Sequence, residues 1–121
     1  MLLDSASKRA RFLEQAVLEL GLDAVTVVTA RCETFVAPPE APVACVLARA
    51  LAPLDRLLRW TGHLLAPGVP LLAMKGPGWR EEAAALPAGY RVAAATPYDV
   101  PGTGRTHVLV RVEREGEHSE P

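Results

Sequence analysis

The stretch MLLDSASKRARFL, residues 1–13, decides the fold of this chain. It places a short apolar run that ends in Asp4 before a hydroxyl-rich turn and the start of a basic, amphipathic helix. That order is typical of a strand-to-helix crossover in a nucleotide-binding α/β fold. We therefore expect a parallel sheet, and we expect the chain to begin inside that fold.

Asp4 admits two interpretations. In open parallel sheets, ligands bind at the carboxyl ends of the strands, where an acid after the second strand accepts hydrogen bonds from both hydroxyls of an adenosine ribose. Alternatively, Asp4 only caps the following helix, because Asp and Ser satisfy the free amides of a first helical turn. A ribose-binding acid usually follows a Gly-rich phosphate loop by about 20 residues, and no such loop stands before Asp4 in this sequence. Both interpretations stay open on these residues alone.

Length and composition predict one small globular domain. The chain has 121 residues, of which 50% are hydrophobic, and this is enough for a core. We expect the domain to span 1–112, followed by a charged, disordered tail over 113–121 that lacks apolar residues. The formal net charge of -1 argues against a protein that coats nucleic acid by bulk electrostatics, so any RNA contact must be a local basic patch.

The cysteines and the apolar runs bear on the cellular compartment. Cys32 and Cys45 fall in no metal-ligand spacing, and Cys45 lies in an apolar run, so we expect buried free thiols in a reducing cytosol and no metal site. No basic leader precedes an apolar segment, and no apolar run approaches the roughly 20 residues that span a bilayer. The sequence therefore predicts a soluble, cytoplasmic protein without membrane contact.

Apolar runs separated by Pro and Gly predict the order of the elements. Spacing of a helical period favours helices over 7–20, 53–65 and 79–86. Gly21 is expected to end the first of these in a left-handed conformation. Short apolar runs favour strands over 24–29, 43–48, 69–74, 90–98 and 106–112. The last two strands flank a Gly-rich turn and should be antiparallel, in a sheet that is otherwise mostly parallel.

Charged residues follow several of these strands, at the edge where an α/β sheet binds ligands. Glu33 either accepts a hydrogen bond from an adenine amino group or is solvated. Arg49 needs an anionic partner, which is either Glu33 or Asp4 in an ion pair, or a ligand or RNA phosphate. Lys75 ends a strand and Arg105 lies in the last turn, and each either acts at the same edge or is merely solvated.

Five short motifs occur in one order over nearly the whole chain. They are Leu2-Leu3-Asp4-Ser5 with Lys8-Arg9 and Arg11-Phe12-Leu13, Arg31-Cys32-Glu33, Ala48-Arg49-Ala50, Ala73-Met74-Lys75-Gly76, and Val100-Pro101 with Gly104-Arg105-Thr106-His107. No single motif is diagnostic. Together they resemble the C-terminal part of the bacterial small-subunit rRNA (guanine-N7)-methyltransferase family, RsmG, also called GidB.

The resemblance implies a class I methyltransferase fold, which is a Rossmann-like α/β sheet. It also implies S-adenosyl-L-methionine as the cofactor and small-subunit ribosomal RNA as the partner. The residues that match the family's cofactor site are Asp4 at the ribose, Cys32 and Glu33 beside the adenine, and Arg49. The residues that match its RNA-binding basic residues are Lys8, Arg9, Arg31, Lys75 and Arg105.

The chemistry of that family fits this set of residues. Guanine N7 carries a free lone pair, so methyl transfer from a sulfonium needs alignment and charge stabilisation more than a general base. We therefore assign no catalytic residue.

The chain departs from the family pattern upstream of Asp4. The family's N-terminal helical region, its first strand and the Gly-rich loop that holds the methionine end of the cofactor have no counterpart in this sequence. The missing strand belongs in the middle of the sheet, and its absence leaves two apolar edges that favour association. We therefore expect a truncated chain.

Two other functions stay open. One is a non-catalytic remnant that contacts RNA weakly or self-associates. The other is a NAD-dependent oxidoreductase, which shares an acid after the second strand.

Overall fold

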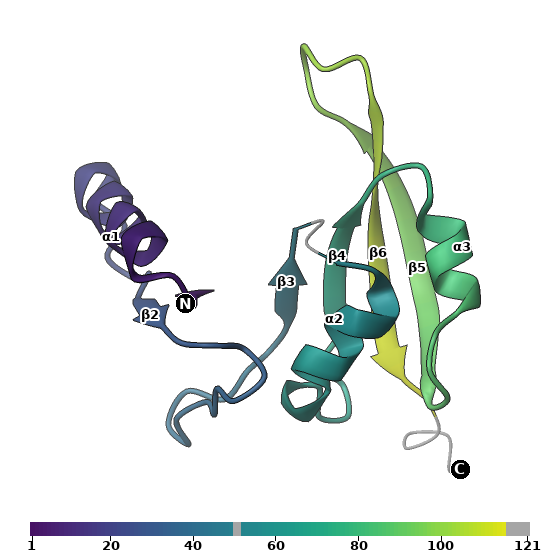
Figure 1. Ribbon diagram of the computed structural model, residues 1–121, viewed down its shortest axis with the longest axis horizontal. Coiled ribbons are helices and arrows are strands. Elements are labelled where there is room, and N and C mark those ends of the chain that lie inside the picture. The colour runs from purple at the N-terminus through teal and green to yellow at the C-terminus, as the bar shows by residue number, and fades with distance from the viewer. Residues whose placement is uncertain (50–51, 116–121) are drawn as a thin grey trace. The chain divides into compact units, whose positions relative to one another are not determined.

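Figure 1 shows the computed structural model of the protein, which describes residues 1–49 and 52–115. The chain divides into two compact units, Met1–Val36 and Ala37–Pro121. The described strands form two sheets, one of two strands and one of four. That residues 1–112 form one domain stays a prediction.

The unit Met1–Val36 contains the parallel strand pair that the opening stretch predicts. β1 (Leu2–Asp4) and β2 (Val27–Thr29) are parallel, and α1 (Ser7–Leu20) connects them. Asp4 is opposite Thr29, so both strands end at the same edge. β2 begins at Val27 instead of residue 24, because β1 is three residues long and offers partners to three residues of β2.

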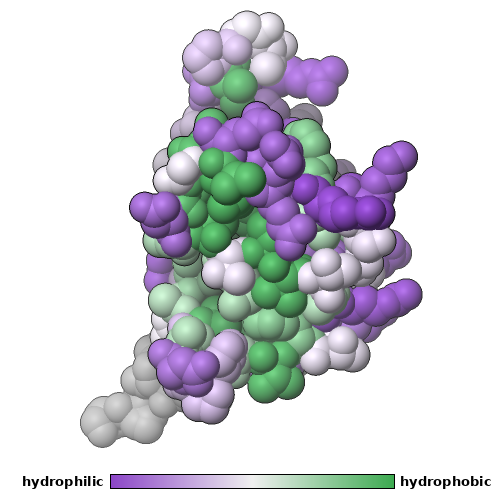
Figure 2. Space-filling model, turned by 90° about the vertical axis from the view of Figure 1, so that its left-hand side faces the viewer, coloured by the Kyte–Doolittle hydropathy of each residue, from purple (hydrophilic) through white to green (hydrophobic). Residues whose placement is uncertain are grey.

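The helix α1 ends as predicted but buries less of its apolar face than predicted. Gly21 adopts a left-handed φ of 66°, and its N–H donates to the carbonyl of Leu18 at 3.2 Å. Ala10 is buried, whereas Phe12 and Leu20, which the helical spacing places on the packing face, are 71% and 70% exposed. Two short strands are too small to cover that face. Figure 2 shows hydrophobic side chains at the surface, between hydrophilic ones, on the face of the molecule that it displays.

The unit Ala37–Pro121 is built on a four-stranded sheet with the order β3-β4-β6-β5 (Figure 1). Its elements are β3 (Val46–Ala48), α2 (Leu54–Thr61), the 3-10 helix η1 (Gly62–Leu64), β4 (Leu71–Lys75), α3 (Trp79–Ala84), β5 (Tyr90–Asp99) and β6 (Thr106–Arg114). β3 and β4 are parallel, and β6 is antiparallel to both β4 and β5. Three strands thus share one direction and the last strand opposes them, as the sequence predicts.

The core of this unit lies on one face of the four-stranded sheet, against α2 and α3. Alternate residues of β4 and β6 point to this face, and α2 contributes leucines at helical spacing. The buried core residues are Leu54, Leu57, Leu58, Leu65, Leu71, Ala73, Val108, Val110 and Val112. Helical spacing places Leu54, Leu57, Leu58, Thr61 and Leu65 on one face of the predicted helix over 53–65. All five are buried, although α2 itself ends at Thr61.

The prediction of two buried thiols is corrected at Cys45. β3 begins at Val46, so Cys45 precedes the strand and is exposed. Cys32 is half-buried, and both cysteines are free thiols. The apolar run 43–48 therefore contributes only its last residues to the sheet.

The predicted tail begins too early. Glu113 and Arg114 belong to β6, where they pair with Arg91 and Tyr90 of β5. The hairpin therefore continues past residue 112, because β5 supplies ladder partners for these charged residues as well. Glu115 follows β6, and its N–H donates to the carbonyl of Gly89 at 2.9 Å. The remaining residues of the predicted tail, 116–121, lie outside the described residues.

Candidate functional site

The carboxyl ends of three strands meet at one edge of the four-stranded sheet, which we call the carboxyl edge. β3, β4 and β5 run in the same direction and end there. The loop 100–105, between β5 and β6, extends from the same edge (Figure 1). Open α/β sheets bind ligands at this edge. The structure thus brings three predicted site residues, Arg49, Lys75 and Arg105, to one edge.

Arg49 and Arg105 are exposed at the carboxyl edge. Arg49 directly follows β3, and within the described part of its own unit no carboxylate pairs with it. Arg105 ends the loop 100–105, whose turn is closed by Thr103. The Thr103 hydroxyl donates to the carbonyl of Val100 at 2.9 Å and accepts the backbone N–H of Arg105 at 3.3 Å. Both guanidinium groups are therefore accessible to an anionic ligand.

Lys75 differs from these two arginines because its ammonium group is buried. The side chain is 5% exposed, and Nζ lies 2.9 Å from Glu82 Oε1 and donates to the carbonyl of Ala52 at 2.5 Å. A lysine at the end of a strand is usually solvated, but here α3 brings a carboxylate to it. That Lys75 binds RNA stays a prediction, and the structure gives its ammonium two internal partners. The sequence did not predict Glu82 as the partner of Lys75, because nothing in the residues around Glu82 indicates this contact.

Asp4 ends β1 and is engaged by two neighbours. Its Oδ1 accepts the backbone N–H of Ala6 at 2.9 Å, and Arg9 Nε lies 3.2 Å from Oδ1 and 3.0 Å from Oδ2. Asp4 thus closes a tight turn before α1, while Ala6 occupies the N-cap position without a side-chain hydrogen bond. Asp4 therefore does not occupy the N-cap position of α1, but its carboxylate stabilises the turn that leads into the helix. Lys8, Arg9 and Arg31, the predicted RNA-binding residues of this unit, are all exposed.

The contacts of Asp4 predict how it titrates. The hydrogen bond from Arg9, and then the one from Ala6, holds the pKa of the Asp4 carboxyl below its ordinary value. Because the folded-state pKa is depressed, the contact stabilises the fold fully above the unfolded-state pKa, and this contribution is lost as the pH falls through the folded-state pKa. We expect carbon-13 NMR to show this low midpoint, and Arg9→Ala to raise it toward the ordinary value.

The control for this titration is Lys8→Ala, which removes a neighbouring exposed cation and leaves the hydrogen bonds from Ala6 and Arg9 to Asp4 in place. It should move the midpoint much less than Arg9→Ala does. An identical midpoint in the original chain and in Arg9→Ala would contradict the direct ion pair.

The segment after β2 forms a turn that carries the residues predicted beside the adenine. The carbonyl of Arg31 accepts the N–H of Thr34 at 3.2 Å, and that of Cys32 accepts the N–H of Phe35 at 3.3 Å. The Cys32 thiol donates to Glu33 Oε1 across 3.7 Å. Cys32 is half-buried and Glu33 is exposed. The Glu33 carboxylate therefore remains accessible to a further donor.

The two thiols should differ in reactivity. Burial, and then the Glu33 carboxylate, raises the pKa of the Cys32 thiol, whereas Cys45 is exposed. At neutral pH we expect iodoacetamide to label Cys45 several-fold faster than Cys32, as measured by peptide mass spectrometry. Glu33→Gln should accelerate labelling of Cys32 and leave Cys45 unchanged. Equal rates at the two cysteines would contradict the hydrogen-bonded state of Cys32.

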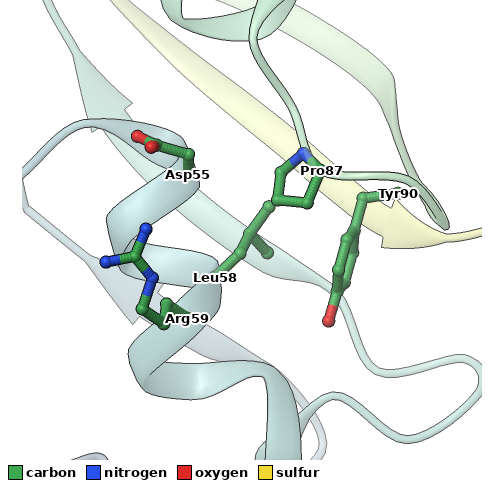
Figure 3. A pocket seen from close by; sticks show the side chains of 5 residues that line it. All are labelled: Asp55, Leu58, Arg59, Pro87 and Tyr90. Carbon is green, nitrogen blue, oxygen red and sulfur yellow. The ribbon is translucent and has the colours of Figure 1, made fainter.

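A shallow hollow of about 340 Å³ lies away from the carboxyl edge (Figure 3). Asp55, Leu58 and Arg59 of α2 line one side, and Pro87 and Tyr90 line the other. Tyr90 is the first residue of β5, so its side of the hollow lies at the opposite end of that strand from the carboxyl edge. None of the predicted site residues lines this hollow.

The described residues contain neither a cluster of metal ligands nor a helix that could span a membrane. Among residues 1–49 and 52–115, no three His, Cys, Asp or Glu side chains gather in a way that could hold a metal ion. In that part of the chain, every helix is too short or too polar to cross a bilayer.

Fold and site together define a mixed α/β protein whose charged residues follow the carboxyl ends of parallel strands. The family model described as "GidB: rRNA small subunit methyltransferase G" matches residues 1–110. The chain belongs to this family. A sheet with parallel and antiparallel strands is consistent with such a methyltransferase family.

Three relatives named ribosomal RNA small subunit methyltransferase G are similar to this chain. The protein from Marinobacter nauticus is 46% identical over 116 residues, which cover 93% of this chain and 53% of the relative. Those from Aromatoleum aromaticum and Escherichia fergusonii are 44% and 43% identical, covering 93% and 90% of this chain and 52% of each relative. The chain spans about half the length of the curated relatives it matches, and corresponds to their C-terminal part. The resemblance inferred from the five motifs is thereby confirmed.

Proposed function

We propose that this chain contributes the C-terminal part of an S-adenosylmethionine-dependent enzyme that methylates guanine N7 in small-subunit ribosomal RNA. The observation that carries the proposal is the match of residues 1–110 to a family described as rRNA small subunit methyltransferase G. The names of the relatives support the same activity. They favour methyl transfer over the hydride transfer of a NAD-dependent oxidoreductase.

Acceptor groups after β1 and β2 fit the adenosine end of this cofactor. An ionised carboxylate has about four lone-pair positions, and Asp4 uses them for Ala6 and for Arg9, whose side chain is 70% exposed. Because the Arg9 side chain is exposed, ribose hydroxyls can replace it as hydrogen-bond donors to the Asp4 carboxylate. Glu33 suits the adenine amino group as an exposed acceptor, and Cys32 beside it suits the face of the ring. S-adenosylmethionine, when bound, supplies a methyl group activated by its sulfonium.

Exposed cations fit the phosphates of an RNA substrate. Arg105 lies at the carboxyl edge, and Arg49 beside β3 suits the cofactor and, being exposed, an RNA phosphate as well. Guanidinium groups bind phosphate oxygens through two parallel hydrogen bonds, which orients the backbone of the RNA. In the other unit, Lys8, Arg9 and Arg31 add exposed positive charge. A direct RNA contact by Lys75 is not carried into this proposal, because its ammonium is buried.

These residues position the reactants, and the lone pair of guanine N7 attacks the methyl group. No proton has to leave N7 before the new bond forms, so alignment and charge stabilisation account for the chemistry. The finer fold, a class I sheet without its first strand and Gly-rich loop, stays a prediction of the resemblance. Among the described residues, β1 and β3 each pair with a single neighbouring strand, which is compatible with this prediction.

Titration calorimetry with S-adenosylmethionine tests the cofactor site. The cofactor is titrated into this chain, and into a fusion in which the part of the Marinobacter nauticus relative outside the match precedes it. We expect the fusion to bind with micromolar affinity, about −8 kcal/mol. Asp4→Asn should weaken binding by about tenfold or more, because an amide removes charged acceptors from two ribose hydroxyls.

The matched control is Asp23→Asn, which alters an exposed acid of the same unit. It should leave the affinity unchanged. Equal affinities for Asp4→Asn and the original fusion would contradict the ribose role of Asp4. The transferred methyl group is then located by mass spectrometry of nucleosides from treated small-subunit RNA, and a product other than 7-methylguanosine would contradict the proposed target atom.

One observation favours the alternative of a non-catalytic chain that self-associates or contacts RNA. Several apolar side chains are largely exposed, among them Leu18 at 75%, Leu20 at 70% and Leu47 at 59%. Sedimentation velocity over a range of concentrations tests this function. Association that grows with concentration, together with no cofactor binding by either protein, would favour it over the methyltransferase.

A further inference from the structure

Two aromatic side chains stack next to the loop 100–105. Tyr98 of β5 and His107 of β6 lie opposite each other in the ladder of the hairpin. Their ring centres are 5.4 Å apart, and the ring planes are inclined by 24°. Both residues are half-buried. The pair lies close to the carboxyl edge, yet the proposed cofactor and RNA contacts use neither ring.

The stacked pair lies on the face of the four-stranded sheet that is opposite α2 and α3. Val108 of β6 is buried in the core, on the face that those two helices cover. Successive residues of a strand point to opposite faces, so His107 points away from this core. Tyr98 is its ladder partner and therefore lies on the same face as His107.

One side of the Tyr98 ring has no strand against it. β5 is the last strand in the order β3-β4-β6-β5, so β6 is its single neighbour in the described part of the sheet (Figure 1). His107 of β6 stacks on one side of the phenol ring. The other side is turned away from β6, toward the edge of the sheet. Since Tyr98 is only half-buried, part of its surface is accessible.

His107 is suited to support that ring. Its Nε2 atom is buried and, among residues 1–49 and 52–115, has no hydrogen-bond partner. A buried polar atom without a partner destabilises the fold, and native proteins tolerate such costs chiefly at functional positions. Stacking against the flat imidazole limits rotation of the Tyr98 ring and keeps its free side turned outward.

An accessible cation lies beside the two rings. Arg105 is exposed and precedes His107 by two residues. Its backbone N–H donates to the Thr103 hydroxyl at 3.3 Å, which fixes the end of the loop. Asp99, the acid next to Tyr98, points to the opposite face of β5, so its charge does not lie over the ring. The hairpin thus combines a guanidinium group with an aromatic surface.

This combination suits single-stranded RNA. Each unpaired nucleotide offers a phosphate and a base whose flat faces are uncovered, whereas each base of a duplex is already stacked between its neighbours. Proteins that bind single strands combine cations along the backbone with aromatic side chains on which the bases stack. Such stacking tolerates any sequence, because every base has a π-face.

We propose that Tyr98, supported by His107, is a stacking platform for an unpaired base of the RNA whose phosphate Arg105 binds. This inference rests on the proposed function, since it takes RNA as the ligand of the carboxyl edge. Tyr98 binds the RNA in this proposal and takes no part in methyl transfer. His107 is a positioning residue, which acts through the ring of Tyr98.

The test compares two single strands of the same length, oligoadenylate and a ribose-phosphate strand from which every base is absent. Both carry the same phosphates, so they differ only in what can stack. Fluorescence anisotropy at several salt concentrations measures the affinity of the whole chain for each strand. The original chain should bind oligoadenylate about tenfold more tightly than the abasic strand, the effect of one stacked base.

Variants of Tyr98 separate the ring from its bulk. Tyr98→Leu keeps an apolar side chain in the hairpin but has no flat ring, so it should weaken oligoadenylate binding by about tenfold and leave abasic binding and the salt slope unchanged. Tyr98→Phe should bind as the original chain does. The control is Thr96→Ala, which alters an exposed residue on the same face of β5 and should change neither affinity.

Variants of His107 test the supporting role. His107→Leu should weaken oligoadenylate binding several-fold, because the Tyr98 ring loses the flat surface on which it stacks. His107→Phe should restore the affinity, because a phenyl ring supplies that surface again. Circular dichroism of each variant establishes that the hairpin is folded. Equal affinities for the leucine and phenylalanine variants would overturn the positioning role of His107.

Arg105→Ala separates the proposed RNA contact from the stacking platform. It should weaken binding of both strands and lower the salt slope by about 1, because a phosphate contact is lost. If neither strand binds, or if Arg105→Ala has no effect, the RNA role of the carboxyl edge is overturned together with the platform. If Tyr98→Leu weakens both strands equally, or neither, the platform alone is overturned and the proposed function stands.

Discussion

Replacing Leu71 by alanine is expected to lower the free energy of unfolding of the unit Ala37–Pro121 by about 2–5 kcal/mol. Leu71 is fully buried and starts β4, where it lies opposite Val46 of β3 and Val112 of β6. Removing its side chain loses buried apolar surface and leaves a cavity among neighbours held by ladder hydrogen bonds. Since domains are stable by only about 5–15 kcal/mol, urea denaturation should show a large fall in the midpoint.

The matched control for this prediction is the next residue of the same strand. Leu72 points to the opposite face of the sheet and is only half-buried. Leu72→Ala should therefore cost about 1 kcal/mol, because a partly exposed side chain loses less buried surface and leaves a smaller cavity. Equal losses for the two variants would show that the face against α2 and α3 is not the principal core.

Replacing Arg114 by alanine should cost the same unit about 1.5–3 kcal/mol, the value of hydrogen bonds to a charged group. Arg114 Nε donates to the carbonyl of Leu65 at 2.5 Å, and Nη2 donates to that of Gly62 at 2.7 Å. The guanidinium also lies over the ring of Tyr90, 5.1 Å from its centre. One side chain at the end of β6 therefore binds two carbonyls of the segment 62–65, which follows α2.

Arg114→Lys should recover less than half of this loss. A lysine has one ammonium on a flexible stem and cannot reproduce the planar fork that reaches two carbonyls at once. Arg91→Ala is the control, since Arg91 is 44% exposed and bonds a carboxylate of the same hairpin, and it should change stability by less than about 1 kcal/mol. Thermal unfolding followed by circular dichroism compares the three variants, and full recovery by lysine would contradict the two-carbonyl contact.

The order of the elements could be predicted because each is set by neighbouring residues. The leucines of α2 recur at helical spacing, and the valines of β6 alternate, so the buried face of each is visible in the sequence. Gly21 marks the end of α1 for an equally local reason, its left-handed φ. The lengths of β2 and β3 could not be predicted, because a strand extends only as far as its partner does.

The candidate site was predicted less completely, for a related reason. Asp4 ends a strand, Arg49 directly follows one and Arg105 lies in the last turn. The sequence placed these residues at the strand ends where the structure has them. The burial of Lys75 depends on Glu82 and on the carbonyl of Ala52, which is 23 residues away in the sequence. A contact between residues so far apart leaves no periodic pattern in the sequence. A buried lysine and a solvated lysine at the end of a strand therefore cannot be told apart from the sequence.

The position of β6 between β4 and β5 has a consequence for protein synthesis. The ribosome makes β6 last, yet this strand joins the hairpin to the rest of the sheet. Until β6 has been made, one edge of β4 has no strand to pair with, and the leucines of α2 lack part of the core that covers them. Such a partly folded state is prone to aggregation. A chain released before Thr106 would stay in that state, so this unit acquires its fold only after β6 has been made.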